Sequence, residues 1–305
     1  MENKKKELPE KIMKLKKAKN AVILAHNYQI EEVQLVANYL GDSLALSQVA
    51  AEVDADIIVF AGVKFMAETA KILSPDKKVL LPRLDAGCPM ADMIVPEELR
   101  ELKEKHKNAK VVTYVNSTAE IKAESDACCT SSNAVKVVKN IEADEIIFIP
   151  DRNLGSYVQK MVPEKKIILF EGYCYVHNRI KKEEIEAMKE LYPDAIVLVH
   201  PEVRAEVTEI ADKVLSTSGL LDFVSTSPHK QFIVATEQGL LERMKRENPG
   251  KKIYPAFRPK ICSNMKRTSL QDVYDSLNEE KYEITVDSSI ASRARNALEA
   301  MLKYV

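Results

Sequence analysis

A pattern of hydrophobic and polar positions returns three times along the chain. Apolar runs at 22–28 (VILAHNY), 111–117 (VVTYVNS) and 196–202 (IVLVHPE) each end in polar residues. The runs are rich in β-branched side chains, which is typical of strands that are buried on both faces of a parallel sheet. A segment with helical spacing follows each run. The pattern therefore predicts a repeated strand–helix unit.

The rest of each copy keeps the same order of landmarks. The second signature is GDS at 41–43, TSS at 130–132 and STSG at 216–219. A further strand, a helix, a lysine pair and a last short strand follow, and each copy then reaches a cysteine. These cysteines, Cys88, Cys174 and Cys262, are 86 and 88 residues apart. Landmarks in the same order at nearly constant spacing indicate a triplicated unit.

Strands that alternate with helices predict parallel sheets with helices on both faces and right-handed crossovers. We therefore expect an α/β fold of three pseudo-symmetric, Rossmann-like α/β/α domains around a central active site. An N-terminal helix is expected from the helical spacing of Leu8, Ile12 and Leu15. The predicted ranges are 1–107 for the first repeat with this helix, 108–193 for the second, 194–282 for the third, and 283–305 for a C-terminal strand and helix that pack back on the first.

Polar landmarks stand where the predicted strands end. Ligands of open parallel sheets bind beyond the carboxyl ends of the strands, so a threefold arrangement would bring these side chains to one cavity. They are His26, Asn116 and His200 after the first strand of each copy, and Ser43, Ser131 and Thr217 after the second. Taken singly, a structural histidine or a helix-capping hydroxyl is the commoner explanation, but the shared position favours a site. Helix N-termini there favour a substrate with phosphate or carboxylate groups.

The cysteines give the sharpest chemical signal. No CxxC pair occurs in the sequence, which argues against the usual structural zinc site, and thiolates also suit iron–sulfur clusters. Three thiolates on a four-iron cluster leave one iron open to act as a Lewis acid. A three-thiolate zinc site and three buried structural cysteines are the alternatives. Cys128 and Cys129 have no equivalents in the other copies, so we interpret them as packing residues, with a redox role as the alternative.

Composition narrows the class of protein. The 305 residues carry 45 Lys and Arg against 46 Asp and Glu, a net charge of -1, so neither nucleic acid nor a membrane is an expected partner. No apolar run approaches the ~20 residues of a membrane helix, and the first residues lack the apolar core of a signal peptide. These features predict a cytoplasmic protein, in which five cysteines are not a disulfide framework. Many Lys and Glu residues without Trp lean towards a thermophilic source.

Short ordered motifs cover nearly the whole chain. They are AHNYQ (25–29), GDS, GCPMAD (87–92), YVNST (114–118), PDRNLG (150–155), VHPE (199–202), STSG, T-E-x-G (236–239) and C-x-N-M-K (262–266). Together they resemble the quinolinate synthase family of NAD biosynthesis. The resemblance implies condensation of iminoaspartate with dihydroxyacetone phosphate to quinolinate, with loss of phosphate and two waters. It also implies three similar α/β domains and one 4Fe-4S cluster per chain, held by Cys88, Cys174 and Cys262.

The resemblance also implies roles for single residues. The residues that would contact substrate are His26, Ser43, Tyr114, Asn116, Ser131, His200, Glu202 and Thr217. Tyr28 and Glu202 resemble the acid/base groups, and His26 joins them in the catalytic set. Tyr28 occurs only in the first copy and Glu202 only in the third, so we expect repeated residues to bind and unrepeated ones to transfer protons. Glu68 is a candidate helper, although a solvated helix glutamate is the simpler interpretation.

Departures, partners and alternatives complete the prediction. Relatives often have C-P-V-H at the middle cysteine ligand, whereas this chain has CYVH, with Tyr175 in the proline position. Some relatives carry a C-terminal cysteine pair that is linked to redox control. This chain lacks that pair, so we expect no redox switch of that kind. The expected partner is an aspartate oxidase or dehydrogenase that supplies iminoaspartate, and the chain is expected to be a monomer or homodimer. The alternative functions are a zinc-dependent lyase and a non-catalytic iron–sulfur sensor. A sensor needs only the cysteines, so the presence of Tyr28, His26, His200 and Glu202 argues against it.

Overall fold

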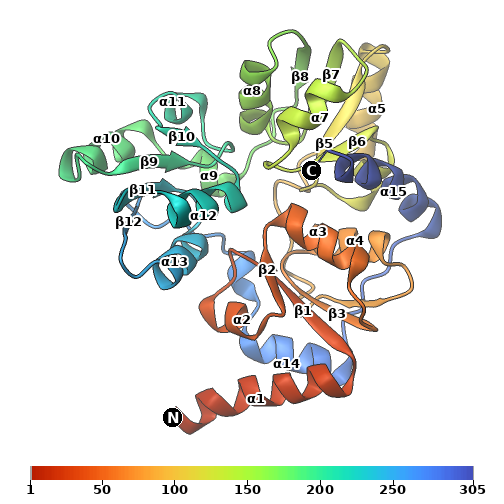
Figure 1. Ribbon diagram of the computed structural model, residues 1–305. Helices are drawn as coiled ribbons and strands as arrows, with labels where there is room; N and C mark the ends of the chain where they lie inside the picture. Colours follow the sequence, from red (N-terminus) through yellow and green to blue (C-terminus); the bar gives the residue numbers. More distant parts are fainter. Residues whose placement is uncertain (1, 305) are drawn as a thin grey trace.

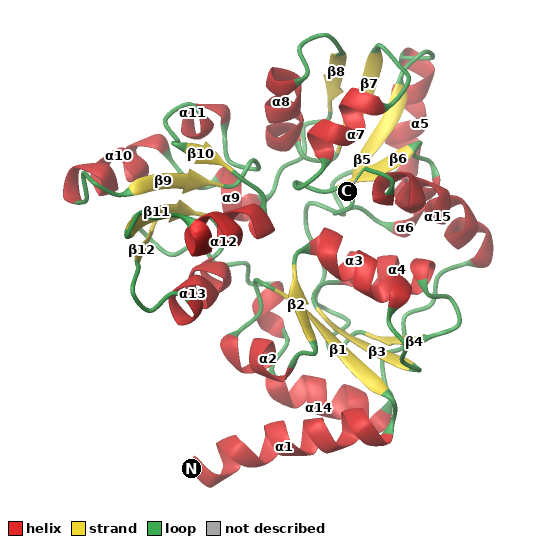
Figure 2. Ribbon diagram, in the orientation of Figure 1, coloured by secondary structure: helices red, strands yellow, loops and turns green. Residues whose placement is uncertain are grey.

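The computed structural model describes residues 2–304, with side chains from Glu7 to Tyr304. It contains three sheets of four parallel strands, and in every sheet the first strand lies between the second and the third. Helices flank the sheets (Figure 2). This arrangement confirms the predicted α/β fold of repeated α/β/α units.

The first repeat is built on the sheet β2-β1-β3-β4. Its strands are β1 (Ala21–His26), β2 (Tyr39–Gly41), β3 (Ile57–Ala61) and β4 (Lys78–Leu80). Its helices are α2 (Glu31–Val36), α3 (Ser43–Glu52), α4 (Lys64–Leu73) and α5 (Pro96–Lys105). Every residue of β3 is buried, as the apolar run predicts for an inner parallel strand.

The second and third repeats copy this order. The second sheet holds β5 (Lys110–Tyr114), β6 (Ala127–Cys129), β7 (Glu145–Ile149) and β8 (Lys166–Leu169), with α6 (Ala119–Ala123), α7 (Ala134–Asn140), α8 (Arg152–Met161), α9 (Tyr175–Asn178) and α10 (Lys182–Leu191). The third holds β9 (Ile196–Val199), β10 (Lys213–Val214), β11 (Gln231–Ala235) and β12 (Lys252–Pro255), with α11 (Ala205–Thr208), α12 (Thr217–Thr226) and α13 (Gln238–Glu247).

A shared hydrogen bond reveals how closely the copies match. In each repeat, the side chain just before the second strand accepts from the backbone N–H near the start of the first strand. The pairs are Asn38 with Ile23 at 3.0 Å, Asp126 with Val111 at 2.8 Å, and Asp212 with Val197 at 2.8 Å. The separation along the chain is 15 residues every time, so the register between the first two strands is fixed in the same way in all three sheets.

The terminal helices connect the repeats. The N-terminal helix α1 (Glu2–Ala18) packs on α14 (Leu270–Glu279), and both cover the first sheet, although α14 follows the third sheet in the chain (Figure 1). The C-terminal helix α15 (Ser288–Leu302) packs on α6 and β6 and also on α4 (Figure 2). The short 3-10 helix η1 (Met265–Arg267) lies between the last sheet and α14. Among the described helices, none combines the length and apolar character that crossing a membrane requires.

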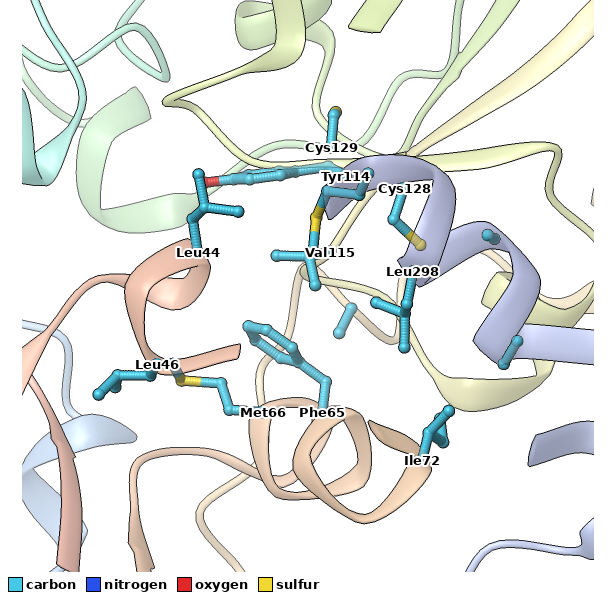
Figure 3. Close-up of a cluster of buried hydrophobic side chains, with 14 of the residues drawn as sticks. Leu44, Leu46, Phe65, Met66, Ile72, Tyr114, Val115, Cys128, Cys129 and Leu298 are labelled. Atoms are coloured by element: carbon cyan, nitrogen blue, oxygen red, sulfur yellow. The ribbon is translucent and has the colours of Figure 1, made fainter. Parts of the chain in front are cut away.

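The first two repeats and α15 share one hydrophobic core, shown in Figure 3. Cys128 and Cys129 are fully buried in it, as expected of packing residues. The prediction that Glu68 is a solvated helix residue is wrong, because α3, α6 and α15 cover α4 and leave this glutamate only 8% exposed. Its carboxylate lies 3.5 Å from the ammonium of Lys64, and burial raises its pKa. Glu68 does not line the central cavity described below.

Candidate active site

One cavity collects every residue that the sequence predicted for the site. It has about 740 Å³ of empty volume, a figure that includes the space at its open mouth. The predicted residues on its wall are His26, Tyr28, Ser43, Cys88, Tyr114, Asn116, Ser131, Cys174, His200, Glu202, Thr217 and Cys262. All three repeats therefore contribute to a single compartment at the carboxyl ends of their strands.

Two of the predicted hydroxyl residues begin helices without capping them. Ser43 and Thr217 are the first residues of α3 and α12, and the capping oxygens belong to the residues before them. Asp42 accepts from Ala45 N at 3.0 Å, and Ser216 accepts from Gly219 N at 3.2 Å. The simple capping explanation for Ser43 and Thr217 is therefore wrong, and both side chains are on the cavity wall.

The two histidines of the cavity are buried and neutral. Burial lowers the pKa of His26 to about 4 and that of His200 to about 3. The Nδ1 atom of His26 accepts a hydrogen bond from Tyr28 N at 3.1 Å, and that of His200 accepts from Glu202 N at 3.4 Å. Each ring therefore carries its proton on Nε2, and these N–H groups are donors for a ligand.

Asn116 presents an unused acceptor in the same cavity. Its Oδ1 atom is buried and has no hydrogen-bond partner among the described residues. Because a buried polar atom without a partner is costly, this position favours a bound molecule that donates a hydrogen bond.

Glu202 lies at the centre of a buried network. Its carboxylate accepts from the Tyr114 hydroxyl and contacts His177 Nδ1 at 2.5 Å. Burial acts to raise the pKa of Glu202, but the interactions with His177, His200 and Tyr114 outweigh it and hold the pKa below its usual range. The side chain is therefore held as a carboxylate.

A chain of hydrogen bonds joins Glu202 to Tyr28. His177 Nε2 lies 3.0 Å from the Thr236 hydroxyl, which lies 3.2 Å from the Tyr28 hydroxyl. Tyr28 also contacts the Thr217 hydroxyl at 3.2 Å. Burial, and then the charge of Glu202, raise the pKa of Tyr28 well above its usual value. The two unrepeated residues predicted to transfer protons are thus the ends of one network, with a proton donor at one end and an acceptor at the other.

Sequence reasoning missed the two residues in the middle of this network. His177 and Thr236 do not line the cavity wall itself, and neither has a counterpart role in all three repeats. Both lay inside motifs that were recognised, CYVH and T-E-x-G. A polar residue directly after a strand was the available signal for Thr236, which follows β11.

The three cysteines follow the last strand of each sheet and face the cavity. Within the described chain, the trio Cys174, His177 and Glu202 is the one compact group of metal-type ligands, with atoms within 4.8 Å of one another. The three cysteine sulfurs therefore do not all lie within 4.8 Å of one another. Three thiolates on one tetrahedral zinc would lie about 3.8 Å from each other, given Zn–S bonds of about 2.3 Å. At least two of the cysteine sulfurs would therefore have to move closer together to share a single zinc ion.

Tyr175 ties two of the cysteine loops together. Its hydroxyl lies 3.0 Å from the Ser263 hydroxyl and accepts from Ser263 N at 2.9 Å. It also lies 3.8 Å from the sulfur of Cys262. The residue that departs from the C-P-V-H pattern therefore supports the loop of another cysteine, and Cys174 keeps its place on the cavity wall.

Comparison with known proteins agrees with this geometry. The family model described as Quinolinate synthetase A protein matches residues 10–303. The quinolinate synthase of Caldicellulosiruptor bescii is 55% identical over 97% of this chain and 98% of its own length. The quinolinate synthase of Thermodesulfovibrio yellowstonii is 53% identical over the same shares, and that of Methanoregula boonei is 52% identical over 97% of each chain. The chain therefore belongs to the quinolinate synthase family.

Proposed function

We propose that this protein condenses iminoaspartate with dihydroxyacetone phosphate to form quinolinate, phosphate and two waters. The observation that most supports the proposal is the convergence of three cysteines, neutral hydrogen-bond donors and a proton-transfer network on one buried cavity. Both substrates are anions that carry carbonyl or imine groups. The cavity matches them with polar side chains and helix N-termini rather than with a cluster of cations.

Substrate carboxylates and phosphate would bind to donors from all three repeats. His26 and His200 offer N–H groups that stay neutral, so they bind anions without the cost of two buried positive charges. The α3 and α12 helices begin at Ser43 and Thr217, and their first backbone N–H groups favour negative charge. The acceptor Asn116 Oδ1 suits the imine or hydroxyl side of the substrates.

Glu202 and Tyr28 would carry the proton chemistry. Condensation needs a proton removed beside a carbonyl, and each dehydration needs a proton delivered to the departing hydroxyl. Glu202 is held as a carboxylate, the form that can accept a proton, and Tyr28 as a neutral phenol, the form that can donate one. The link through Thr236 and His177 gives a route by which the proton state of one can be restored from the other.

Cys88, Cys174 and Cys262 would hold a 4Fe-4S cluster, because all three line the same cavity and thiolates suit iron–sulfur clusters. When bound, the cluster would supply a Lewis-acidic iron for a substrate oxygen. Burial raises the pKa of the three thiols, so they lose their protons as metal binds.

An anaerobic assay for quinolinate with both substrates, combined with iron and sulfide quantitation, tests the proposal. We expect a brown protein with broad absorbance near ~400 nm, typical of iron–sulfur chromophores. Each of Cys88→Ala, Cys174→Ala and Cys262→Ala should abolish both the cluster and quinolinate formation. A colourless, zinc-replete and active protein, or full activity in any cysteine variant, would overturn the proposal.

A further inference from the structure

Two buried acidic side chains lie next to the candidate cluster ligands but outside the cavity. Asp151 and Glu237 are both 0% exposed, and neither is on the cavity wall. They belong to the motifs PDRNLG and T-E-x-G, and the proposed reaction provides no role for either acid. Each is the N-cap residue of the helix that follows the third strand of its sheet, α8 for Asp151 and α13 for Glu237.

Each carboxylate uses its two oxygens for two different backbone groups. In the second repeat, Asp151 Oδ1 accepts from Leu154 N at 2.8 Å and Oδ2 accepts from Cys174 N at 3.0 Å. In the third repeat, Glu237 Oε2 accepts from Gly239 N at 2.6 Å and Oε1 accepts from Cys262 N at 3.0 Å. One oxygen therefore caps a helix, and the other fixes the backbone of a candidate cluster cysteine.

The first repeat lacks this device. Val63 is the N-cap residue of α4, and its side chain has no acceptor. A different hydrogen bond is present in all three copies. In each, the backbone N–H of the residue after the N-cap donates to a carbonyl in the loop before the cysteine. These bonds are Lys64 N to Ala86 O at 2.8 Å, Arg152 N to Gly172 O at 2.9 Å, and Gln238 N to Lys260 O at 2.8 Å. The carboxylates are therefore an addition to a shared loop geometry, present for Cys174 and Cys262 alone.

Capping alone does not explain two buried carboxylates. A serine caps α12 in the same fold, and burying an acidic side chain is costly unless its oxygens are hydrogen-bonded. Glu237 has Lys266 at 3.2 Å, whereas no cation of the described chain lies within 4 Å of Asp151 (Arg152 pairs with Glu171 instead). An acidic side chain has a second acceptor oxygen at a fixed distance from the first, which serine lacks. In both repeats this second oxygen accepts a hydrogen bond from the cysteine N–H.

We propose that Asp151 and Glu237 are positioning residues that hold the backbones of Cys174 and Cys262 in place before the cluster binds. The inference rests on the proposed function, in which these cysteines are cluster ligands. Ligands fixed by such neighbouring hydrogen bonds lose less freedom when metal binds, and the metal is retained longer. The loop of Cys88 is held without a carboxylate.

Hydrogen–deuterium exchange of the cluster-free protein tests the positioning directly. We expect Asp151→Ser to accelerate exchange about tenfold in peptides that cover 172–176 and to leave 260–264 unchanged, and Glu237→Ser to do the reverse. Serine keeps a capping oxygen, so these variants remove the cysteine contact and not the cap. The isosteric variants Asp151→Asn and Glu237→Gln provide a second pair in case the serine variants fold poorly.

The cluster-loaded protein supplies the second measurement. Loss of cluster to an iron chelator should be about tenfold faster in each variant than in the unaltered chain. Asp126→Asn and Asp212→Asn are matched controls, because each of these acids also accepts a backbone N–H at 2.8 Å but at the opposite edge of the same sheets. We expect these controls to leave both the cysteine peptides and the cluster lifetime unchanged.

The outcomes separate this inference from the proposed function. Unchanged exchange at the cysteine peptides, or acceleration spread evenly over the chain, would overturn the positioning role. Equal effects in the two control variants would overturn it as well. An unaltered chain that takes up no iron and sulfide would instead defeat the proposed function, while the exchange measurement on the cluster-free protein would still decide whether the carboxylates hold the cysteine loops.

Discussion

The carboxylate of Asp42 accepts a hydrogen bond from the hydroxyl of Ser218, with 2.6 Å between Oδ2 and Oγ. The same oxygen accepts from the hydroxyl of Ser132 at 3.2 Å, while Oδ1 caps α3 through Ala45 N. Asp42 belongs to the first repeat, Ser132 to the second and Ser218 to the third. One carboxylate on the cavity wall therefore joins all three repeats.

Replacing Asp42 should loosen this junction. In Asp42→Ala the N-cap of α3 is lost and two hydroxyls lose their common acceptor, so we expect the free energy of unfolding to fall by about 2–4 kcal/mol. Chemical denaturation followed by circular dichroism measures this. Ser132→Ala and Ser218→Ala each remove one bond and should cost about 1 kcal/mol. If either serine variant alone lowered the free energy of unfolding as much as Asp42→Ala does, the N-cap hydrogen bond of α3 would contribute nothing.

Removing the Thr236 hydroxyl should interrupt the network between Tyr28 and His177. Thr236→Val preserves shape and removes the atom that lies 3.2 Å from Tyr28 and 3.0 Å from His177. We expect kcat for quinolinate formation to fall about 100-fold, with unchanged iron and sulfide content. The exposed Thr226 provides the control variant Thr226→Val, which should retain activity. Undiminished kcat in Thr236→Val would show that protons do not travel by this route.

Replacing Glu202 should separate cluster binding from turnover. Glu202→Gln retains a partner for Tyr114 but loses the carboxylate that His177 and Tyr114 stabilise. We expect the cluster content to stay at its normal level and turnover to fall at least about 100-fold. The exposed Glu206 gives the control Glu206→Gln. Loss of the cluster in Glu202→Gln would instead assign Glu202 a structural role.

The repeat and the cavity residues could be predicted from the sequence because each is marked by a local signal. A β-branched run predicts a strand, and a polar residue at the end of the run predicts a place at the sheet edge where His26, Asn116 and His200 lie. The cysteines were recognisable because their spacing copies the length of the repeat. These features depend on nearest neighbours along the chain and on one general rule of parallel sheets.

The contacts between repeats could not be predicted in the same way. His177 meets Glu202 across 25 residues and Thr236 across 59, and these meetings depend on how α9 packs against the third sheet. The sequence predicts a solvated Glu68 because its own helix gives no sign that α15, more than 200 residues later, covers it. The same limit applies to Asp42, whose serine partners lie 90 and 176 residues away.

His26 should make stability depend on pH. The pKa of His26 is about 4 in the folded chain and about 6.5 in the unfolded chain. Between pH ~4 and ~6.5 the unfolded chain therefore binds a proton at His26 that the folded chain does not bind. The contribution of His26 to stability is therefore fully present above pH ~6.5 and is reduced by up to about 3 kcal/mol as the pH drops to ~4. Denaturation of the cluster-free protein at several pH values measures this loss, which His26→Gln should reduce and the exposed-residue control His229→Gln should not. Identical pH profiles for His26→Gln and the unaltered chain would contradict the assignment.

The lysine pairs of the three repeats divide into a capping and a surface member. The first lysine of each pair donates to backbone carbonyls at the carboxyl end of the helix that follows the second strand of its repeat. These helices are α3, α7 and α12. These bonds are Lys77 to Val53 O, Lys165 to Ile141 O, and Lys251 to Val224 O, Ser225 O and Ser227 O. A cation at this place satisfies carbonyls that the helix leaves free and interacts favourably with the helix dipole.

Substituting the first lysine should therefore cost more stability than substituting the second. We expect Lys77→Met and Lys165→Met each to lower the free energy of unfolding by about 1 kcal/mol, and Lys251→Met to lower it most, because three carbonyls lose their donor. The neighbours on the exposed surface give the matched controls Lys166→Met and Lys252→Met, which should change it by less than about 0.5 kcal/mol. Urea denaturation of the five variants measures the differences. Equal losses for first and second lysines would mean that the pairs act through general charge, since the two members differ in their contact with the helix ends.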